Sequence, residues 1–89
     1  MTYAKTLNQS NLASNNNKFY ILQILHSESN PSNFIFFTRW GRVGVEGQRA
    51  LIPYHSPDVA IREFNKKLRD KINGGYREVE MNYEDDNKK

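Results

Sequence analysis

The sequence predicts an α+β domain, a twisted and mostly antiparallel β-sheet with one α-helix packed across one face. Three observations lead to this prediction. Apolar and aromatic residues gather into short runs of strand length, a single stretch at residues 57–72 has helical spacing, and short connections separate these elements. The sequence contains no β-α-β repeat, which is the pattern of a parallel sheet. A chain of 89 residues has room for one hydrophobic core only. We expect a single domain over residues 1–83.

The chain up to residue 54 contains three clear strand patterns and a weaker one. Residues 3–9 predict a short strand, and the Asn-rich residues that follow predict an ordered loop. Residues 18–26 form a continuous run with apolar side chains on both parities, which predicts a central strand covered on both faces. Residues 34–40, rich in aromatic and β-branched side chains, and residues 48–54 predict two more strands.

The helix is expected to begin after Ser56, a typical N-cap residue that is followed by Pro57 at the first helical position. Apolar residues then recur at spacings of three and four and form one stripe, Ile61, Phe64, Leu68 and Ile72. The glycines at 74–75 end the helix, because glycine adopts the left-handed conformation without a steric clash. Residues 76–83 alternate and predict a half-exposed strand, and residues 84–89 are expected to be a disordered charged tail.

Charge is distributed unevenly along the chain, whose formal net charge is +3. Eleven basic and five acidic residues precede residue 78, whereas residues 78–89 hold two basic and five acidic ones. A basic body with an acidic tail favours an anionic partner, because attraction depends on local charge. The same charges are equally consistent with a solvated surface.

Composition excludes several classes of protein. No run approaches the ~20 apolar residues of a membrane span, and the N-terminus lacks the apolar core of a signal peptide. Without cysteine there is no disulfide framework, thiol nucleophile or cysteine-based zinc site. We therefore expect no membrane partner, and a nuclear location in a eukaryote or a cytoplasmic one otherwise.

Catalytic chemistry has little support in this sequence. His26 and His55 are far apart, neither lies in a motif, and no third metal ligand accompanies them. The acidic residues cluster in the tail, where no apolar setting raises a pKa, and there is no Gly-x-Ser-x-Gly turn. We expect a protein without enzymatic activity, cofactor, metal or small-molecule substrate.

Gly41, Gly44 and Gly47 recur every three residues between two strand patterns. This spacing differs from the Gly-x-Gly-x-x-Gly nucleotide loop, and the segment leads into a strand rather than a helix. The sequence therefore excludes a nucleotide loop and leaves a glycine-rich turn whose backbone amides can form a small anion site.

The most informative cluster is Arg39-Trp40-Gly41-Arg42, where an aromatic strand meets this turn. Trp40 offers a flat ring for a base or sugar, and each guanidinium offers a planar fork for a phosphate. Gly41 permits close approach of another backbone and permits Arg42 to turn to the side of Trp40. Alternatively, Trp40 caps the core and the arginines are solvent-exposed charges. Strand parity does not decide between these interpretations, because two phenylalanines of the strand share the face of Trp40.

These residues resemble the WGR domain, a module of DNA-damage-responsive poly(ADP-ribose) polymerases and of some bacterial proteins. The resemblance rests on Arg39-Trp-Gly-Arg-Val-Gly44 followed by Gly47-Gln48, on Asn-rich segments at 7–12 and 15–20, and on the helix at 56–71. It covers about residues 3–83. The family fold is a sheet with one helix across it, in agreement with the fold predicted above.

The resemblance implies a module that binds the ends of broken double-stranded DNA and contacts neighbouring domains of a larger polymerase. By this resemblance, Trp40 stacks on the terminal nucleotide and Arg42 holds the 5′-phosphate. Polar and phenolic contacts are expected from Asn17 and Tyr76, and parity also puts Tyr76 on the polar side of its strand. The full set of predicted nucleic-acid contacts is Asn17, Lys18, Arg39, Trp40, Arg42, Gln48 and Tyr76. Lys18 and Arg39 are alternatively plain positive charges, and Gln48 a turn residue.

The sequence departs from the polymerase pattern in one place, since the connection at residues 72–76 is shorter and resembles the bacterial forms. The 89 residues leave no room for an ADP-ribosyltransferase domain, so we expect no transfer of ADP-ribose by this chain. Two other hypotheses stay open. One is a protein-interaction module in which Trp40 and Arg42 make an interdomain contact. The other is a single-stranded RNA binder, which the lone tryptophan disfavours.

Overall fold

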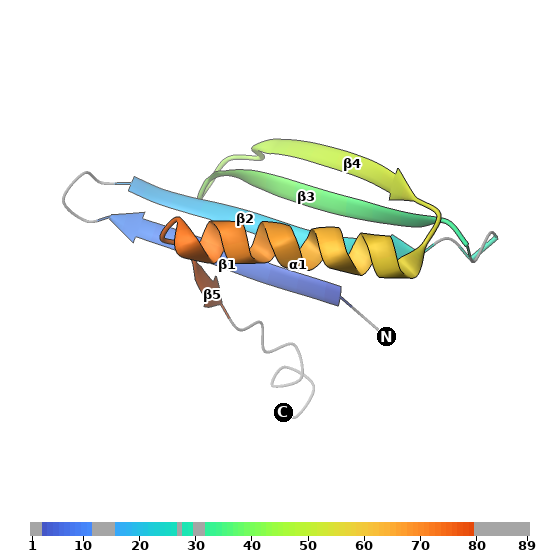
Figure 1. The fold of residues 1–89 in the computed structure, drawn as a ribbon. Coiled ribbons are helices and arrows are strands. Elements are labelled where there is room, and N and C mark those ends of the chain that lie inside the picture. Colours follow the sequence, from blue (N-terminus) through green and yellow to red (C-terminus); the bar gives the residue numbers. More distant parts are fainter. Residues whose placement is uncertain (1–2, 12–15, 27, 30–31, 80–89) are drawn as a thin grey trace, which may run out of the picture.

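The computed structural model describes residues 3–11, 16–26, 28–29 and 32–79. Within these residues the elements, in chain order, are β1 (Tyr3–Asn11), β2 (Asn16–His26), β3 (Phe34–Arg42), β4 (Gln48–Tyr54), α1 (Pro57–Asn73) and β5 (Arg77–Val79). The strands form one sheet in the order β4-β3-β2-β1-β5, and every neighbouring pair is antiparallel. Helix α1 lies across one face of this sheet (Figure 1). The predicted α+β class is confirmed.

The core lies between α1 and the middle of the sheet. Strand alternation directs every second side chain of β1, β2 and β3 toward the helix, so these positions are buried. The fully or nearly buried cluster consists of Leu7, Tyr20, Leu22, Phe36 and Phe64. Ala60 and Phe64 are the buried residues of the helix, and the rings of Phe36 and Phe64 lie 5.9 Å apart.

Helix α1 begins as the sequence predicts. The hydroxyl of Ser56 accepts a hydrogen bond from the backbone N–H of Val59 at 3.4 Å, and Pro57 occupies the first turn. At the other end, Gly75 has a φ of 108°, the left-handed conformation that favours glycine. The predicted apolar stripe is wrong at Ile72, which is 41% exposed. In that last turn Lys71 lies over the ring of Tyr20 instead.

The strands near the Asn-rich hairpin are longer than the sequence predicts. Residues expected to form a loop pair instead, with Ser10 opposite Asn17 in β1 and β2. The side chain of Asn8 donates a hydrogen bond to the Asn17 side-chain oxygen at 2.9 Å, and the Ser10 hydroxyl lies 3.0 Å from the same oxygen. These polar side chains therefore bond across the strands rather than competing with the backbone. Residues 12–15 lie outside the described part of the chain.

Two further strand limits differ from the prediction. β3 continues through Gly41 to Arg42 rather than breaking at the glycine. The last strand begins at Arg77, one residue later than predicted, and is described only to Val79. The predicted strand residues 80–83 and the predicted tail 84–89 lie outside the described residues.

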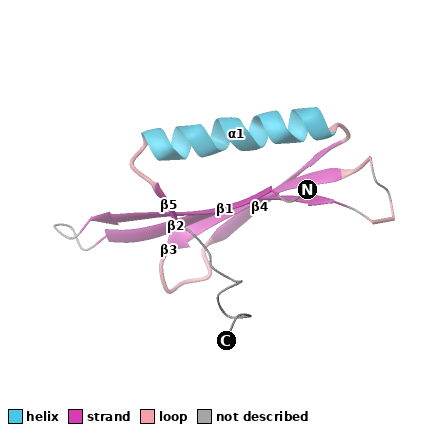
Figure 2. Ribbon diagram, turned by 90° about the horizontal axis from the view of Figure 1, so that it is seen from below, coloured by secondary structure: helices cyan, strands magenta, loops and turns pink. Residues whose placement is uncertain are grey.

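The prediction that β2 is covered on both faces is wrong for the described structure. β2 is central in the sheet, with β1 and β3 as neighbours. Only the side that carries α1 is covered by another element, as Figure 2 shows with the helix above the sheet. A single helix covers one face, and no other described segment is available for the second.

Candidate nucleic-acid interface

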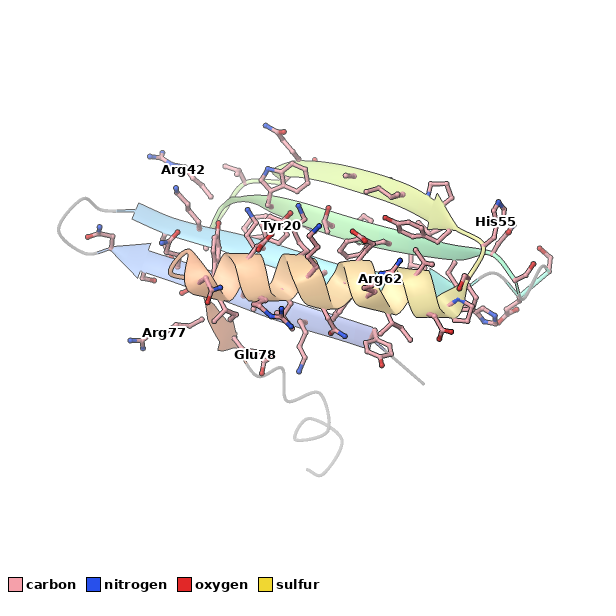
Figure 3. All side chains as sticks on the ribbon, viewed as in Figure 1. Tyr20, Arg42, His55, Arg62, Arg77 and Glu78 are labelled. Atoms are coloured by element: carbon pink, nitrogen blue, oxygen red, sulfur yellow. The ribbon has the colours of Figure 1, made fainter. Side chains whose placement is uncertain are left out.

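The predicted contacts meet at one end of the sheet, where β2 begins and β3 ends. The register places Lys18 opposite Arg42 and Tyr20 opposite Trp40. Gln48, at the start of β4, is opposite Trp40 on its other side. Because side chains alternate along a strand, these residues all lie on the face that carries α1. Figure 3 shows Tyr20 beside the helix and Arg42 toward the end of the sheet.

Trp40 packs on Tyr20, which in turn contacts Tyr76. Its ring stacks on Tyr20, with centroids 5.6 Å apart and planes 17° apart. Tyr76 meets Tyr20 edge-on, at 5.9 Å and 72°. Trp40 packs against the core cluster and is only partly buried, so part of its ring is exposed to solvent. Both interpretations of this residue are therefore partly correct: the indole closes the core and still presents surface.

A groove of about 340 Å³ runs between this aromatic group and the helix. Its lining residues are Tyr20, Phe36, Thr38, Trp40, Ala50, Ile52, Lys67, Lys71 and Tyr76. Two lysines and no carboxylate are thus among the lining residues. The ammonium nitrogen of Lys71 lies 4.7 Å from the centroid of the Tyr20 ring. Sequence reasoning missed both lysines, although their separation of four residues places them on one side of a helix.

Positive charge is concentrated next to the groove. Lys18 and Arg42 are directly opposite each other on β2 and β3, and Arg42 is exposed. Like charges at directly opposite positions of an antiparallel pair repel each other. An anion between the two side chains removes that repulsion, so this pair is suited to hold a phosphate.

Burial raises the pKa of the Tyr20 phenol above its ordinary value of 10.0. A hydrogen bond with Thr38 partly offsets that shift, and the neighbouring Tyr76 adds to it. Burial also raises the pKa of Tyr76. Both phenols therefore stay neutral at physiological pH, and the Tyr76 hydroxyl keeps a proton that it can donate to an anion.

The glycine turn fixes the backbone of Trp40. A Cβ added to Gly47, whose φ is 81°, would lie 2.2 Å from the carbonyl oxygen of Trp40. A Cβ on Gly41 would lie 2.9 Å from the Cα of Gly47. The expected close approach at Gly41 is therefore confirmed. Arg42 does not need to turn, however, because a continuous β3 already places it on the face of Trp40.

The end of the helix positions Tyr76. Its backbone N–H donates to the carbonyl of Lys71 at 3.0 Å. The side chain of Gln9, next to Lys18 in the register, donates to the carbonyl of Gly74 at 3.2 Å. These contacts tie the chain that follows α1 to the edge of β1, with Tyr76 against the aromatic group. Tyr76 precedes β5 and is half-buried, which corrects the prediction that it forms part of the strand.

Two predicted contacts are not part of this group. The side-chain oxygen of Asn17 is bonded to Asn8 and Ser10, on the face away from the helix. Arg39 lies on that same face: its Nε donates to the carbonyl of Glu46 at 2.9 Å, and its guanidinium lies 5.1 Å from the ring centroid of Phe19. Alternation separates both from Trp40 and Arg42.

The described residues contain no group of three or more potential metal ligands. His55 Nδ1 lies 3.1 Å from the side-chain oxygen of Asn33, far from the groove (Figure 3). In the part of the chain that the structure describes, no helix is long and apolar enough to cross a membrane.

Comparison with known proteins gives a family match over most of the chain. A family model described as WGR domain matches residues 3–83. Poly [ADP-ribose] polymerase 2 of Arabidopsis thaliana is 51% identical over 70 residues, which are 78% of this chain and 11% of the relative. Protein mono-ADP-ribosyltransferase PARP3 of Homo sapiens is 43% identical over 76 residues, 85% of this chain and 14% of the relative. The chain therefore spans only a small part of the relatives that it matches.

Proposed function

This chain belongs to the WGR domain family, and we propose that it is a non-catalytic module that binds the ends of double-stranded DNA. The matched relatives are named as ADP-ribose polymerases and transferases, and the chain corresponds to a small segment of each. As part of the same proposal, the module serves such an enzyme in the response to DNA damage. The observation that carries it is the opposed pair Lys18 and Arg42 beside the partly exposed ring of Trp40.

The first step of the proposal concerns the phosphate. A 5′-terminal phosphate carries more negative charge than a phosphate within the strand, so it gains more from two cations. Arg42 binds it through the planar fork of its guanidinium, and Lys18 supplies a second charge from the adjacent strand. A charge-assisted hydrogen bond contributes about 1.5–3 kcal/mol.

The second step concerns the terminal nucleotide. In the interior of a duplex both faces of a base pair are stacked, whereas at an end one face is free. Trp40 is fixed by Tyr20 on one side and is partly exposed, so it offers a rigid surface to that free face or its sugar. Stacking of this kind contributes about 1–3 kcal/mol.

The groove extends the contact toward the helix. Lys67 and Lys71 line it without a carboxylate among the lining residues, so its field favours the sugar-phosphate backbone. The neutral hydroxyl of Tyr76 donates a hydrogen bond to a phosphate oxygen. Gln48 lies at the rim beside Trp40 and adds a polar contact.

Few of these groups are suited to read base edges. The lysines and Arg42 bind phosphate, and the aromatic rings stack on a sugar or base. We therefore expect little preference for base sequence. Asn17 and Arg39, on the far face at the same end of the sheet, stay predicted backbone contacts for DNA that continues past the strand ends.

The experiment is a fluorescence anisotropy titration of one short duplex with and without its 5′-phosphates. We expect wild-type protein to prefer the phosphorylated duplex, with affinity that falls as salt increases. Arg42→Ala should weaken binding to the phosphorylated duplex and remove most of that preference. His55→Ala, at the opposite end of the sheet, is the matched control and should bind as the wild type does.

The alternative function is an interdomain contact made by Trp40 and Arg42. In that case the isolated chain would show negligible affinity for either duplex at low salt, and Arg42→Ala would change nothing in the titration. Indifference to the phosphate, or equal affinity of Arg42→Ala and wild type, would overturn the proposed role of Arg42.

A further inference from the structure

The sheet face opposite α1 is uncovered in the described structure. Figure 2 shows the helix on one side of the strands and no described element on the other. This surface, here called the open face, is formed by the alternate residues of the strands that do not point to the core. It does not include the groove or Trp40.

The open face carries several apolar side chains in its middle strands. The register sets Phe37 of β3 between Gln23 of β2 and Leu51 of β4, and Ile21 of β2 opposite Arg39. Exposed fractions are 42% for Leu25, 55% for Leu51 and 40% for Val79. Its apolar members are Phe19, Ile21, Leu25, Ile35, Phe37, Leu51, Pro53 and Val79. Exposed apolar side chains gathered on one face, such as Leu51 and Val79, are typical of an interaction site.

The sequence of β2 agrees with this interpretation. Its apolar side chains occur on both parities, a pattern of strands that are covered on both faces. Helix α1 covers one of these two faces, the one that carries Tyr20 and Leu22. The other parity, with Ile21 and Leu25, has no described cover, so the pattern calls for a partner.

Charge on the open face has a single sign. Arg39, Arg49 and Arg77 project from it, by the register of β3, β4 and β5. None of the described strand residues on this face is an aspartate or glutamate. Glu46, in the turn, pairs with Arg49 at 2.8 Å, and no such partner is described for Arg77.

We propose that the open face docks an amphipathic protein segment that carries aliphatic residues along its centre and acidic residues along its margins. The aliphatic residues cover Ile21, Phe37 and Leu51, and the carboxylates pair with Arg49 and Arg77, which lie on the two edge strands of the sheet. The relatives extend far beyond the matched segment, so adjoining parts of a longer protein can supply such a segment. This proposal does not rest on the Trp40 groove, which lies on the opposite side of the sheet; Asn17 and Arg39 are the predicted DNA contacts that lie on the open face.

Two other occupants fit the face less well. A second copy of the chain, packed face to face, supplies no strand carboxylate to these arginines, because none of the described strand residues on this face is acidic. Nucleic acid satisfies the arginines but leaves exposed aliphatic side chains such as Leu51 and Val79 against a polar backbone. An acidic amphipathic segment satisfies both the apolar centre and the charged margin.

The test uses two synthetic amphipathic helices of about 18 residues with the same leucine stripe, one with glutamate and one with lysine at all other exposed positions. Each is titrated into ¹⁵N-labelled protein. We expect the glutamate peptide to shift backbone resonances at Ile21, Phe37 and Leu51. The lysine peptide should bind about tenfold more weakly.

Two variants make the result specific. Leu51→Asn should weaken the glutamate peptide several-fold, whereas Ile52→Asn, the next residue on the other face with 44% exposure, should not. Arg49→Glu with Arg77→Glu should reverse the preference in favour of the lysine peptide. Amide spectra of each variant confirm the fold.

Several results would overturn the proposal. These are shifts confined to the Trp40 groove, equal binding of the two peptides, or no shift at all. Dimerisation in sedimentation that Leu51→Asn abolishes would assign the face to a second copy instead. Shifts of Phe37, Leu51 and Val79 resonances by duplex DNA, away from the predicted DNA contacts Asn17 and Arg39, would assign the face to nucleic acid.

Discussion

Tyr20 and Trp40, opposite each other on β2 and β3, stack with their ring centroids 5.6 Å apart. Tyr20 is almost fully buried, whereas Trp40 is only partly so. Stacking on the buried Tyr20 therefore holds the partly exposed ring of Trp40 in a fixed position. A surface ring held in this way loses little conformational freedom when a nucleotide stacks on it.

Replacement of Trp40 should separate stacking from folding. We expect Trp40→Ala to weaken binding to a duplex end by about 1–3 kcal/mol, because the stacking surface is lost. Trp40→Phe keeps a ring on Tyr20 and should retain part of the affinity. Anisotropy titration measures both, with thermal denaturation to show the folded fraction. Full affinity of Trp40→Ala would exclude the stacking role.

Repulsion between Lys18 and Arg42 should lower the free energy of unfolding in the absence of DNA. Lys18→Gln removes the repulsion, so we expect the free protein to gain about 0.2–0.5 kcal/mol at low salt while DNA binding weakens. High salt should reduce the gain, because Arg42 is exposed and Lys18 is partly exposed, so that salt screens their repulsion. Urea denaturation at two salt concentrations measures it, with Lys66→Gln on α1 as the control. A stability loss in Lys18→Gln would show that the two cations are not in conflict.

The turn glycines should differ in their tolerance of a side chain. Gly47→Ala places a methyl group against the Trp40 carbonyl at a positive φ, so we expect a loss of about 1–3 kcal/mol or more in the free energy of unfolding. Gly44 also has a positive φ, of 101°, but nothing lies within 4 Å of its added Cβ. Gly44→Ala should therefore cost less. Denaturant unfolding compares them, and equal losses would mean that only the backbone angle matters.

Stability should fall at alkaline pH because of the two tyrosines. The pKa values of Tyr20 and Tyr76 are higher in the folded protein than the 10.0 of an unburied phenol. Above that value the unfolded chain loses protons that the folded protein keeps, so the free energy of unfolding decreases as pH rises. Urea denaturation between about pH 9 and 11 tests this. Tyr20→Phe should show a shallower decrease, and an unchanged slope would contradict the role of Tyr20.

Much of this fold was predictable because each element carries a local signal. Ser56 and Pro57 set the start of α1, and the spacing around Phe64 sets its buried side. The extension of β1 and β2 was not predictable, since it depends on Asn8, Ser10 and Asn17 bonding across strands. Propensity treats such residues as turn formers, and only the pairing partner reverses that preference.

The site was predictable in part for a similar reason. Trp40, Arg42 and Tyr76 lie in motifs, and the structure brings them to one end of the sheet. Lys71 belongs to no motif, and its place over Tyr20 depends on how the last turn of α1 meets the sheet. The separation of Arg39 from Arg42 follows from simple alternation once β3 is known to continue through Gly41.

End recognition itself is tested by comparing an open, 5′-phosphorylated duplex with a dumbbell of the same stem sequence closed by a hairpin at each end. The two present the same internal backbone, so non-specific charge contributes equally to both. We expect anisotropy titration to show clear binding of the open duplex and much weaker binding of the dumbbell at the same salt concentration. Equal affinity for the two would show that Trp40, Lys18 and Arg42 do not recognise a DNA end.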